Sequence, residues 1–373
     1  MSADQPRKLL LLTTAGGGIG GTELMAVGLA RQFVARGWAV RNIFPQTPQS
    51  DSLLAQCAVQ RVPAETSAAI RAVQHKRTLR DILALRSLVR RSKPDVINLH
   101  YGVSHIGFKD VLAVRLAGRS RCVVTVHHPI PLESNRTRVM TRLGGLLSHA
   151  VVVNSHATRG VLLEAGVPAH KIRVILCGVP VPLKLPTRAE ARARLGLAPD
   201  LFVVSTLARL VPEKAIGDLI EAAAHVSDPH SALRLVIAGD GPQRPTLEAL
   251  ATAQLGQRAL FLGHVPDTAD LYAAADVFAL PSHMEGFGLV YVEAAFHGVP
   301  SIGTDVGGVP DAIADEETGL LVPPGDIPTL TKAIARLRDD PDLRRRLGDA
   351  ARARAHREFT ESRMADQYVK VFE

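Results

Sequence analysis

The chain alternates short apolar runs with longer amphipathic stretches, and this alternation predicts repeated βαβ units. Continuous apolar runs such as Leu9–Leu12 and Val151–Val153 are typical of parallel strands buried on both faces. Helical patterns lie between such runs, and glycine or proline often marks where they end. We therefore expect an α/β fold with doubly wound parallel sheets.

The first half of the chain opens in the order strand, glycine loop, helix, strand. We expect the first strand at Lys8–Thr14, the loop at Ala15–Thr22, a helix from about Glu23 to Ala35 and a second strand at Ala39–Phe44. The pattern predicts further strands at Asp95–Leu99, Cys122–Val126, Val151–Val153 and Lys171–Ile175, and helices at Asp81–Arg91 and His105–Ala117.

A second set of similar elements follows a proline-rich break at Cys177-Gly178-Val179-Pro180, where we place a linker. Two domains also suit a chain of 373 residues. The predicted strands of the second set are Leu201–Leu207, Leu233–Ala238, Ala259–Leu262 and Val277–Leu280. Its predicted helices include Arg188–Leu195, Arg244–Gln254, Leu289–Phe296, Asp326–Leu337, Pro341–Arg354 and a final one at about Glu361–Phe372.

Cysteine usage and the N-terminus bear on the compartment. The three cysteines, Cys57, Cys122 and Cys177, are widely spaced, which predicts a reducing compartment without a disulfide framework. The apolar run Leu9–Leu12 is too short for a signal or a membrane span, so we expect a cytoplasmic protein. Cysteines and histidines show no metal-ligand spacing and there is no Asp-x-Asp motif, so we expect no cofactor and no required metal.

The net charge of +8 includes a basic segment at residues 71–93. Its cations are Arg71, Lys76, Arg77, Arg80, Arg86, Arg90, Arg91 and Lys93. Such a face could meet an anionic membrane or a phosphorylated acceptor, or could simply be a solvated helix surface. The basic residues lack interleaved aromatics and no usual binding motif is present, which argues against nucleic acid.

The candidate chemistry concentrates between Pro281 and Gly308, in PSHMEGFGLVYVEAAFHGVPSIGTDVGG. Glu293 lies on an otherwise apolar helix, where a carboxylate needs a hydrogen-bond donor. The amides of Phe287, Gly288 and Leu289 would lie at the helix N-terminus, which favours a phosphate. Together with Glu285 in the preceding loop, these groups suit a nucleotide-sugar. A capped or salt-bridged structural role would explain a single glutamate, but not the whole set.

Cations and histidines follow the predicted strands. Arg209 and Lys214 come just after Leu201–Leu207, where both would suit the oxygens of a diphosphate; two surface cations are the alternative. His100 and His127 follow strands of the first half. The carboxyl ends of parallel strands are where open α/β sheets bind ligands, although ordinary core or surface histidines are common there.

The first glycine loop, AGGGIGGT, contains Gly16, Gly18 and Gly21 in the spacing of the dinucleotide fingerprint. This would favour an NAD-dependent enzyme. The fingerprint also requires an acid near the end of the second strand, and the sequence has none there before Asp51. We therefore favour a loop whose backbone closely approaches another ligand.

Glu285 and Glu293, with seven residues between them and GFGL inside the interval, resemble the Glu-x7-Glu signature of retaining glycosyltransferases. The surrounding pattern resembles family 4 of these enzymes. Ala208-Arg209-Leu210 through Lys214-Ala215 resembles the family's G-R-L-x-x-x-K-G, with alanine in place of both glycines. Cys177-Gly178-Val179 resembles its N-G-V turn.

The resemblance implies the GT-B fold, with two Rossmann-like domains whose parallel sheets face each other across a cleft. We expect residues 1–180, with the returning helix 356–373, to bind the acceptor, and residues 181–355 to bind the donor. The expected reaction moves a hexosyl group from a nucleoside diphosphate sugar, UDP by family frequency, to an acceptor hydroxyl with retained configuration. The acceptor could be an envelope glycan, a lipid-linked glycan or a small molecule, and the protein could contact the inner membrane face.

The resemblance also implies roles for individual residues. Glu285 would hold sugar hydroxyls, His127 (in a T-x-H at a strand end) would contact the sugar, and Glu293 would accept hydrogen bonds from the ribose. Arg209, Lys214 and the amides of Phe287, Gly288 and Leu289 would stabilise the departing diphosphate, and Gly17 and Gly18 would lie near the donor phosphates. A sugar-nucleotide epimerase and a catalytically silent binding protein of the same architecture are the alternatives.

Overall fold

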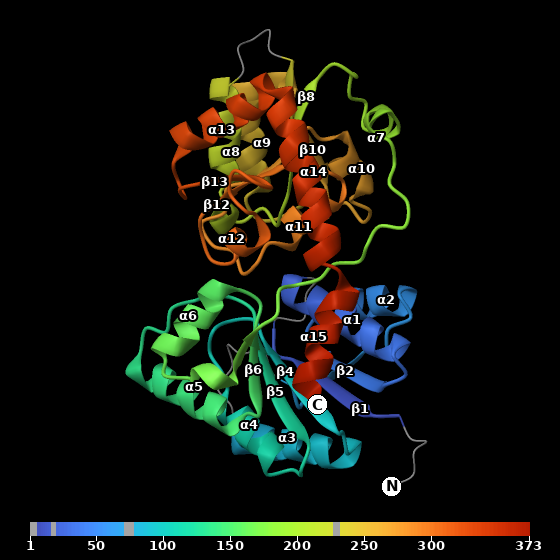
Figure 1. Ribbon diagram of the computed structural model, residues 1–373, viewed down its shortest axis with the longest axis vertical. Helices are drawn as coiled ribbons and strands as arrows, with labels where there is room; N and C mark the ends of the chain where they lie inside the picture. Colours follow the sequence, from blue (N-terminus) through green and yellow to red (C-terminus); the bar gives the residue numbers. More distant parts are fainter. Residues whose placement is uncertain (1–5, 16–19, 71–77, 227–231) are drawn as a thin grey trace. The chain divides into compact units, whose positions relative to one another are not determined.

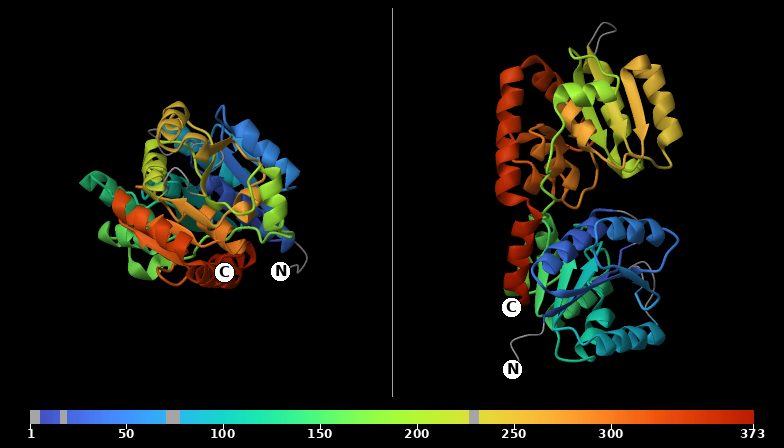
Figure 2. Two further views of the ribbon diagram at one scale, coloured as in Figure 1. Left: turned by 90° about the horizontal axis from the view of Figure 1, so that it is seen from above. Right: turned by 90° about the vertical axis from the view of Figure 1, so that its right-hand side faces the viewer.

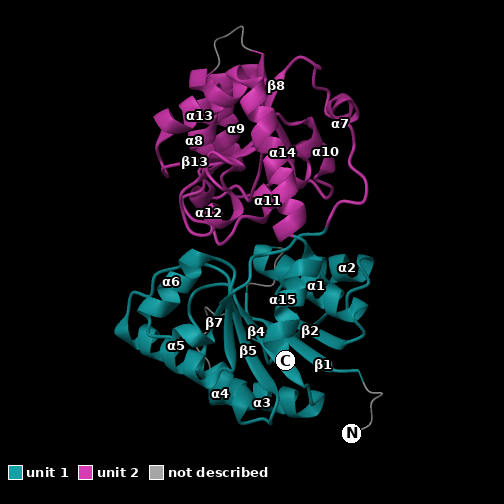
Figure 3. Cartoon of the chain, viewed as in Figure 1, with its two compact units in different colours: residues 1–180, 360–373 teal, residues 181–359 magenta. Residues whose placement is uncertain are grey.

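The chain forms two compact units in the computed structural model, which describes residues 6–15, 20–70, 78–226 and 232–373. Unit 1 comprises Met1–Pro180 and Thr360–Glu373, and unit 2 comprises Val181–Phe359 (Figure 3). The sequence placed the return to the first domain at residue 356. The units divide at Thr360 because helix α14 (Pro341–Glu358) continues to Glu358.

Unit 1 is built on a seven-stranded parallel sheet in the order β3-β2-β1-β4-β5-β6-β7 (Figure 1). Its strands are β1 (Lys8–Thr13), β2 (Ala39–Pro45), β3 (Glu65–Ser67), β4 (Val96–Tyr101), β5 (Arg121–Val126), β6 (Ala150–Val153) and β7 (Ile172–Val174). In β4 and β6 every residue is buried, as expected for strands covered on both faces. The strand order reverses between β1 and β4, which pair from Leu9↔Val96 to Thr13↔His100.

The helices of unit 1 are α1 (Gly21–Ala35), α2 (Ser50–Val59), α3 (Leu79–Ser92), α4 (Phe108–Arg115), α5 (Asn135–Leu147), α6 (His156–Glu164) and α15 (Glu361–Phe372). Helix α15 packs against α1 although the two are far apart in the sequence (Figure 2). Helix α4 contacts both α3 and α5, so these three form one layer. The buried core includes Leu10, Ile97, Val124 and Val151 from the central strands.

Unit 2 has a six-stranded parallel sheet in the order β10-β9-β8-β11-β12-β13. The strands are β8 (Phe202–Leu207), β9 (Leu233–Ala238), β10 (Ala259–Gly263), β11 (Val277–Leu280), β12 (Ser301–Thr304) and β13 (Gly319–Val322). The order reverses between β8 and β11, which are paired neighbours at the centre of the sheet. Ligands of open α/β sheets usually bind at such a point, beyond the carboxyl ends of the strands.

The helices of unit 2 are α7 (Arg188–Arg194), α8 (Ile216–Val226), α9 (Arg244–Leu255), α10 (Ala269–Ala274), α11 (Leu289–Phe296), α12 (Val309–Ala312), α13 (Ile327–Asp339) and α14. Helix α7 is joined to the sheet through the buried carboxylate of Asp276. This carboxylate accepts a hydrogen bond from Arg192 Nη2 at 2.8 Å and another from the backbone N–H of Val203 at 2.8 Å.

The structure also contains elements that were not predicted from the sequence, namely α2, β3, α5, α8 and α12. Strand β3 is a three-residue edge strand, Glu-Thr-Ser, without an apolar run. Helices α2 and α5 bury only a few of their residues. Such elements carry little periodic signal because most of their side chains face solvent.

Candidate active site

The candidate site of unit 2 lies at the carboxyl ends of β8 and β11. Lys214 follows β8 in a short 3-10 turn, and Glu285 follows β11 in a loop. Lys214 Nζ lies 2.6 Å from Glu285 Oε2, and the two side chains are only 18% and 12% exposed. The fold therefore brings together two of the residues that the sequence assigned to the site, at the point where the strand order reverses.

Backbone hydrogen bonds position the loop that carries Glu285. The backbone N–H of His283 donates to the carbonyl of Glu213 at 2.9 Å, which connects this loop to the turn that carries Lys214. The N–H of Gly308, in the second glycine loop, donates to the carbonyl of Glu285 at 3.3 Å. The Lys214–Glu285 pair thus lies on two connected loops rather than on independent ones.

The N-terminus of α11 follows directly after this loop. Gly288 precedes the helix with φ of +87°, and a Cβ there would lie 2.4 Å from the Tyr291 ring. The phenol of Tyr291 donates to the carbonyl of Leu280 at 2.7 Å and so fixes that ring. Because only glycine fits, the backbone can turn sharply and present the first helical amides, which have no carbonyl partner within the helix. Phe287 is buried, with its ring 5.7 Å from that of Phe359.

Glu293 lies one turn into α11 and receives a hydrogen bond from the protein itself. The phenol of Tyr272, in α10, donates to Glu293 Oε2 at 2.7 Å. Burial raises the pKa of Glu293, and the hydrogen bond from Tyr272 partly opposes this. Sequence reasoning foresaw the need for a donor but missed Tyr272, because a tyrosine on another helix carries no local signal. In the described part of the chain, Tyr272 is the only side chain that donates to this carboxylate.

Arg209 lies near the same strand end but is mostly exposed. Its Nη2 is 3.7 Å from Glu213 Oε1, with 71% of the arginine side chain accessible. Exposed ion pairs of this kind contribute little, about 0–1 kcal/mol. The guanidinium can therefore leave Glu213 for a better partner, such as a phosphate, at little cost.

A glycine turn after β9 supports the loop that carries Arg209. Gly239 has φ of +116°, and a Cβ there would lie 1.8 Å from the carbonyl oxygen of Ala208. A Cβ on Gly241 would lie 2.4 Å from the carbonyl oxygen of Leu210. No side chain fits at either position, so these two glycines allow the loops after β8 and β9 to pack backbone to backbone. The sequence had indicated only a turn here.

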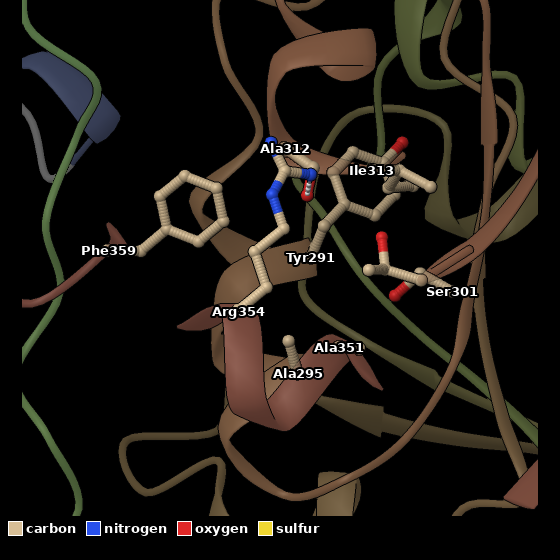
Figure 4. Close-up of a pocket in the computed structure, with 9 residues that line it drawn as sticks. Tyr291, Ala295, Ser301, Ala312, Ile313, Ala351, Arg354 and Phe359 are labelled. Atoms are coloured by element: carbon tan, nitrogen blue, oxygen red, sulfur yellow. Dashed lines mark hydrogen bonds between the residues drawn. The ribbon is translucent and has the colours of Figure 1, made fainter. Parts of the chain in front are cut away.

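Figure 4 shows the packing behind α11, where Arg354 and Phe359 lie close to Tyr291. Arg354 Nη2 donates to the carbonyl of Asp311 at 2.8 Å. The cavity among these residues is about 10 Å³, enough for one water molecule. This region therefore braces α11 and does not hold a substrate.

His127 lies in unit 1, immediately after β5. It is buried, and its Nε2 is 3.1 Å from Nδ1 of His100 at the end of β4. Burial lowers the pKa of His127 well below its usual range, and the neighbouring His100 and His128 lower it further. The histidine is therefore neutral near pH 7.

Residues 16–19 of the first glycine loop lie outside the described residues. They include Gly17 and Gly18, which were assigned to the site, and Gly16 of the dinucleotide spacing.

Neither a metal-binding cluster nor a membrane-spanning helix is present among the described residues. They contain no group of three or more His, Cys, Asp or Glu side chains able to hold a metal ion. None of the helices in these residues has the length and apolar character needed to cross a membrane. Cys57, Cys122 and Cys177 are buried and free.

Two family descriptions match the chain, one in each half. Residues 187–354 match Glycosyl transferases group 1. Residues 19–181 match Glycosyltransferase Family 4. The two matches meet near the boundary between the compact units.

Characterised relatives span most of the chain. N-acetyl-alpha-D-glucosaminyl L-malate synthase of Bacillus anthracis is 24% identical over 98% of this chain and 97% of its own length. D-inositol 3-phosphate glycosyltransferase of Kribbella flavida is 30% identical over 90% of this chain and 86% of its own.

Solved structures share the fold of both units. Anabaena HepE in complex with UDP has a TM-score of 0.84 and 24% identity, covering 98% of this chain and 99% of its own. HepE in complex with UDP-glucose has a TM-score of 0.80 and 25% identity, covering 98% of each chain. These similarities agree with the two parallel sheets described above, and the fold is GT-B.

Proposed function

The chain belongs to family 4 of the glycosyltransferases, and we propose that it transfers a hexosyl group from a nucleoside diphosphate sugar to an acceptor hydroxyl with retained configuration. The observation that carries the proposal is the mostly buried Lys214–Glu285 pair beside the N-terminus of α11. A cation and backbone amides that can bind a diphosphate lie here at the carboxyl ends of the strands, beside a carboxylate that can bind sugar hydroxyls.

The diphosphate gains negative charge as it leaves, and the site lowers the activation barrier mainly by stabilising this charge. Lys214, Arg209 and the amides at Phe287–Leu289 supply positive charge and hydrogen-bond donors from fixed or nearby positions. Preorganised groups of this kind often give the largest catalytic contribution. Lys214 is held by Glu285 before substrate binds, so it is already placed.

The two glutamates bind different parts of the donor, Glu285 the transferred sugar and Glu293 the ribose. Glu285 accepts from sugar hydroxyls with the oxygen that Lys214 leaves free, since the ion pair occupies Oε2. Glu293 accepts from ribose hydroxyls, while Tyr272 holds the other side of its carboxylate. His127 contacts the sugar. The acceptor hydroxyl attacks on the face from which the diphosphate leaves, and a diphosphate oxygen takes its proton.

We propose a UDP-sugar as the donor, because structures of Anabaena HepE contain UDP and UDP-glucose. An envelope glycan or a lipid-linked glycan is the proposed acceptor. No required metal and no cofactor enter this scheme, since Lys214, Arg209 and the amides of α11 carry the charge.

Thermal stabilisation by UDP, GDP, ADP and NAD tests the donor site, since a ligand that binds only the folded state raises the melting temperature. We expect UDP to stabilise the wild type and Lys214→Met to lose most of that shift. Lys332→Met, which removes an exposed lysine of α13, is the matched control. Stabilisation by NAD alone would overturn the proposal. Product analysis with and without acceptor then separates transfer from epimerisation.

We also propose that unit 1 contacts an anionic membrane through a surface formed by α3 and the end of α4. Leu79 and Leu83, one turn apart on α3, are 71% and 52% exposed. Arg86 on α3 donates to the carbonyl of Leu116, which is itself 57% exposed. Exposed leucines among arginines suit an interface of acyl chains and anionic headgroups. Arg71, Lys76 and Arg77 of the basic segment lie outside the described residues.

Sedimentation with vesicles tests this surface. We expect binding to vesicles containing phosphatidylglycerol and none to pure phosphatidylcholine. The double variant Leu79→Gln/Leu83→Gln should lose most of the binding, whereas Val59→Gln, at an 85% exposed valine on α2, should not. Equal sedimentation with both kinds of vesicle, or none with either, contradicts the proposal.

A further inference from the structure

A continuous hydrogen-bonded chain of side chains runs through the interior of unit 1 from α15 to His127. The phenol of Tyr368 lies 3.1 Å from Thr125 Oγ1, which lies 2.9 Å from Asn98 Oδ1. Asn98 Nδ2 lies 2.9 Å from His100 Nε2, and His100 Nδ1 lies 3.1 Å from His127 Nε2. The first four side chains are fully buried and His127 is 2% exposed.

We call this series of five side chains the relay. The donors and acceptors of its members give its hydrogen bonds one direction. Thr125 donates its only hydroxyl proton to Asn98 Oδ1, so it must accept from Tyr368. The amide nitrogen of Asn98 can only donate, so His100 Nε2 is the acceptor and the proton of neutral His100 lies on Nδ1. This proton points at His127 Nε2, which must accept. The proton of neutral His127 is therefore on Nδ1.

Burial keeps the titratable members of the relay, His100, His127 and Tyr368, in their neutral forms near pH 7. Burial lowers the pKa of His100 to about 3 and that of His127 well below its usual range. It also raises the pKa of Tyr368 above that of an ordinary tyrosine. Each histidine thus carries a single proton, and its position depends on the neighbouring hydrogen bonds rather than on pH.

We infer that Tyr368, Thr125, Asn98 and His100 are positioning residues that fix the tautomer of His127, so that it offers an Nδ1–H donor to the ligand. The inference rests on the proposed function, in which His127 contacts the sugar. It deepens that function by naming the partner of His127: an oxygen that accepts a hydrogen bond. Within the described residues, His127 Nδ1 has no hydrogen-bond partner.

The amide of Asn98 is the point on which the direction depends. Turned by 180°, it would place its oxygen against His100 Nε2 and move the proton of His100 to that nitrogen. His100 Nδ1 would then accept from His127 Nε2–H, leaving a bare lone pair on His127 Nδ1. After this turn Thr125 would accept from the amide and donate to Tyr368. The buried phenol proton of Tyr368, whose one hydrogen-bond partner among the described residues is Thr125, would then have no acceptor, and this cost opposes the turn. A residue of the returning helix α15 thus determines the hydrogen-bonding character of a residue after β5.

Nitrogen-15 NMR of histidine-labelled protein tests the relay directly, because the two neutral tautomers give different ring-nitrogen shifts. His100→Gln and His127→Gln assign the signals by their loss. We expect both histidines of the wild type to be Nδ1–H tautomers at neutral pH. Tyr368→Phe and Thr125→Val should convert the His127 signal to that of a tautomer mixture. Tyr101→Phe is the matched control, because it removes a buried phenol hydroxyl that is bonded to Asp110 rather than to the relay.

Donor kinetics give the second readout. Tyr368→Phe should lower kcat/KM roughly two- to tenfold, the value of one lost hydrogen bond, with the melting temperature close to that of Tyr101→Phe. An Nε2–H tautomer at His127 in the wild type, or an unchanged tautomer in both relay variants, would overturn the inference. The NMR result does not depend on activity. A protein with the expected tautomers but no transfer therefore refutes the proposed function alone.

Discussion

At the scale of single residues, the two glutamates of the Glu-x7-Glu spacing have different surroundings. Glu285 is paired with the ammonium of Lys214. Glu293 has a neutral donor, Tyr272, and burial raises its pKa. A carboxylate with a raised pKa loses its charge at a higher pH than an ordinary glutamate does. This difference leads to a pH-dependent prediction for Glu293 alone.

We predict that donor affinity falls as the pH is lowered, because Glu293 becomes protonated at a higher pH than an ordinary glutamate. The ionised carboxylate accepts hydrogen bonds from ribose hydroxyls, so affinity is complete above its raised pKa and is lost as the pH falls through it. Calorimetric titration with UDP between about pH 8 and pH 5 should show this loss. Glu293→Gln should bind UDP more weakly and lack this component.

The control for this experiment is 2′,3′-dideoxy-UDP, which has the same titrating diphosphate but no ribose hydroxyls. Its affinity should be the same for the wild type and for Glu293→Gln at every pH. If UDP and the dideoxy compound show identical pH profiles with the wild type, Glu293 does not bind the ribose.

Ala215 is a second residue whose surroundings give a prediction. It has φ of +51° and ψ of 38°, a left-handed conformation that costs a residue with a Cβ about 1–2 kcal/mol. Glycine removes this strain but loses about 0.5–1 kcal/mol more backbone entropy on folding. Ala215→Gly should therefore raise the free energy of unfolding by roughly 0.5–1 kcal/mol, as measured by urea titration.

Ala208→Gly is the matched control, because Ala208 is the other alanine in the motif that resembles G-R-L-x-x-x-K-G. Ala208 is not among the described residues with positive φ, so glycine brings only its entropic cost there. This variant should be less stable by about 0.5–1 kcal/mol. Equal effects at the two positions would mean that backbone strain at Ala215 is unimportant.

At the scale of secondary-structure elements, α7 illustrates how a buried charge attaches a helix to a sheet. Asp276 precedes β11 and is almost fully buried, as is its partner Arg192 on α7. Arg188, also on α7, lies 2.7 Å from the other carboxylate oxygen. Without the carboxylate, the guanidinium of Arg192 would be a buried and uncompensated charge.

We therefore predict that Asp276→Ala lowers the free energy of unfolding by about 3–5 kcal/mol, the usual cost of removing one partner of a buried pair. Asp270→Ala is the control, since Asp270 pairs with the half-exposed Arg194 of the same helix. That change should cost less than about 1 kcal/mol. Denaturant unfolding measures both values, and similar losses would show that burial does not decide the contribution of these pairs.

Local signals explain which elements could be predicted from the sequence. Helices α11 and α15 have the predicted bounds because Gly288 and Gly298 flank the first and Thr360 caps the second. The fold class followed from the apolar runs of the buried strands. Helix α2 and strand β3 escaped prediction because their residues are mostly polar or exposed.

The site was predictable only where its residues follow one another in the sequence. Glu285, Gly288 and Glu293 belong to one stretch, and the structure pairs Glu285 with Lys214, which was predicted from a different strand end. The supporting residues were not foreseen. Tyr272 reaches Glu293 from another helix, and Tyr368 reaches Thr125 across 243 positions of sequence. Such contacts depend on tertiary packing, which periodicity does not encode.

At the scale of the whole molecule, unit 1 is assembled from two separate parts of the chain, whereas unit 2 is continuous. Helix α15 supplies buried apolar residues to unit 1, namely Met364, Ala365, Tyr368, Val371 and Phe372. Glu361 adds a bidentate pair with Arg31 of α1. The two parts meet closely, since Val179 and Thr360 form a parallel bridge and a Cβ on Gly178 would lie 2.5 Å from the Thr360 carbonyl oxygen.

We predict that residues 1–180 joined to 360–373 by a flexible linker of about six residues fold as an independent domain, because such a linker easily spans ends that lie side by side. Residues 1–180 alone should not fold stably. Truncating one buried aromatic residue costs about 3–5 kcal/mol, so losing the whole apolar face of α15 exceeds the usual stability of a domain, about 5–15 kcal/mol. Circular dichroism during heating should show a cooperative transition for the joined protein and none for residues 1–180 alone.

The control is residues 181–359, which form the continuous unit 2 and should unfold cooperatively without any linker. A cooperative transition at the same temperature with and without α15 would show that this helix is dispensable for the fold of unit 1.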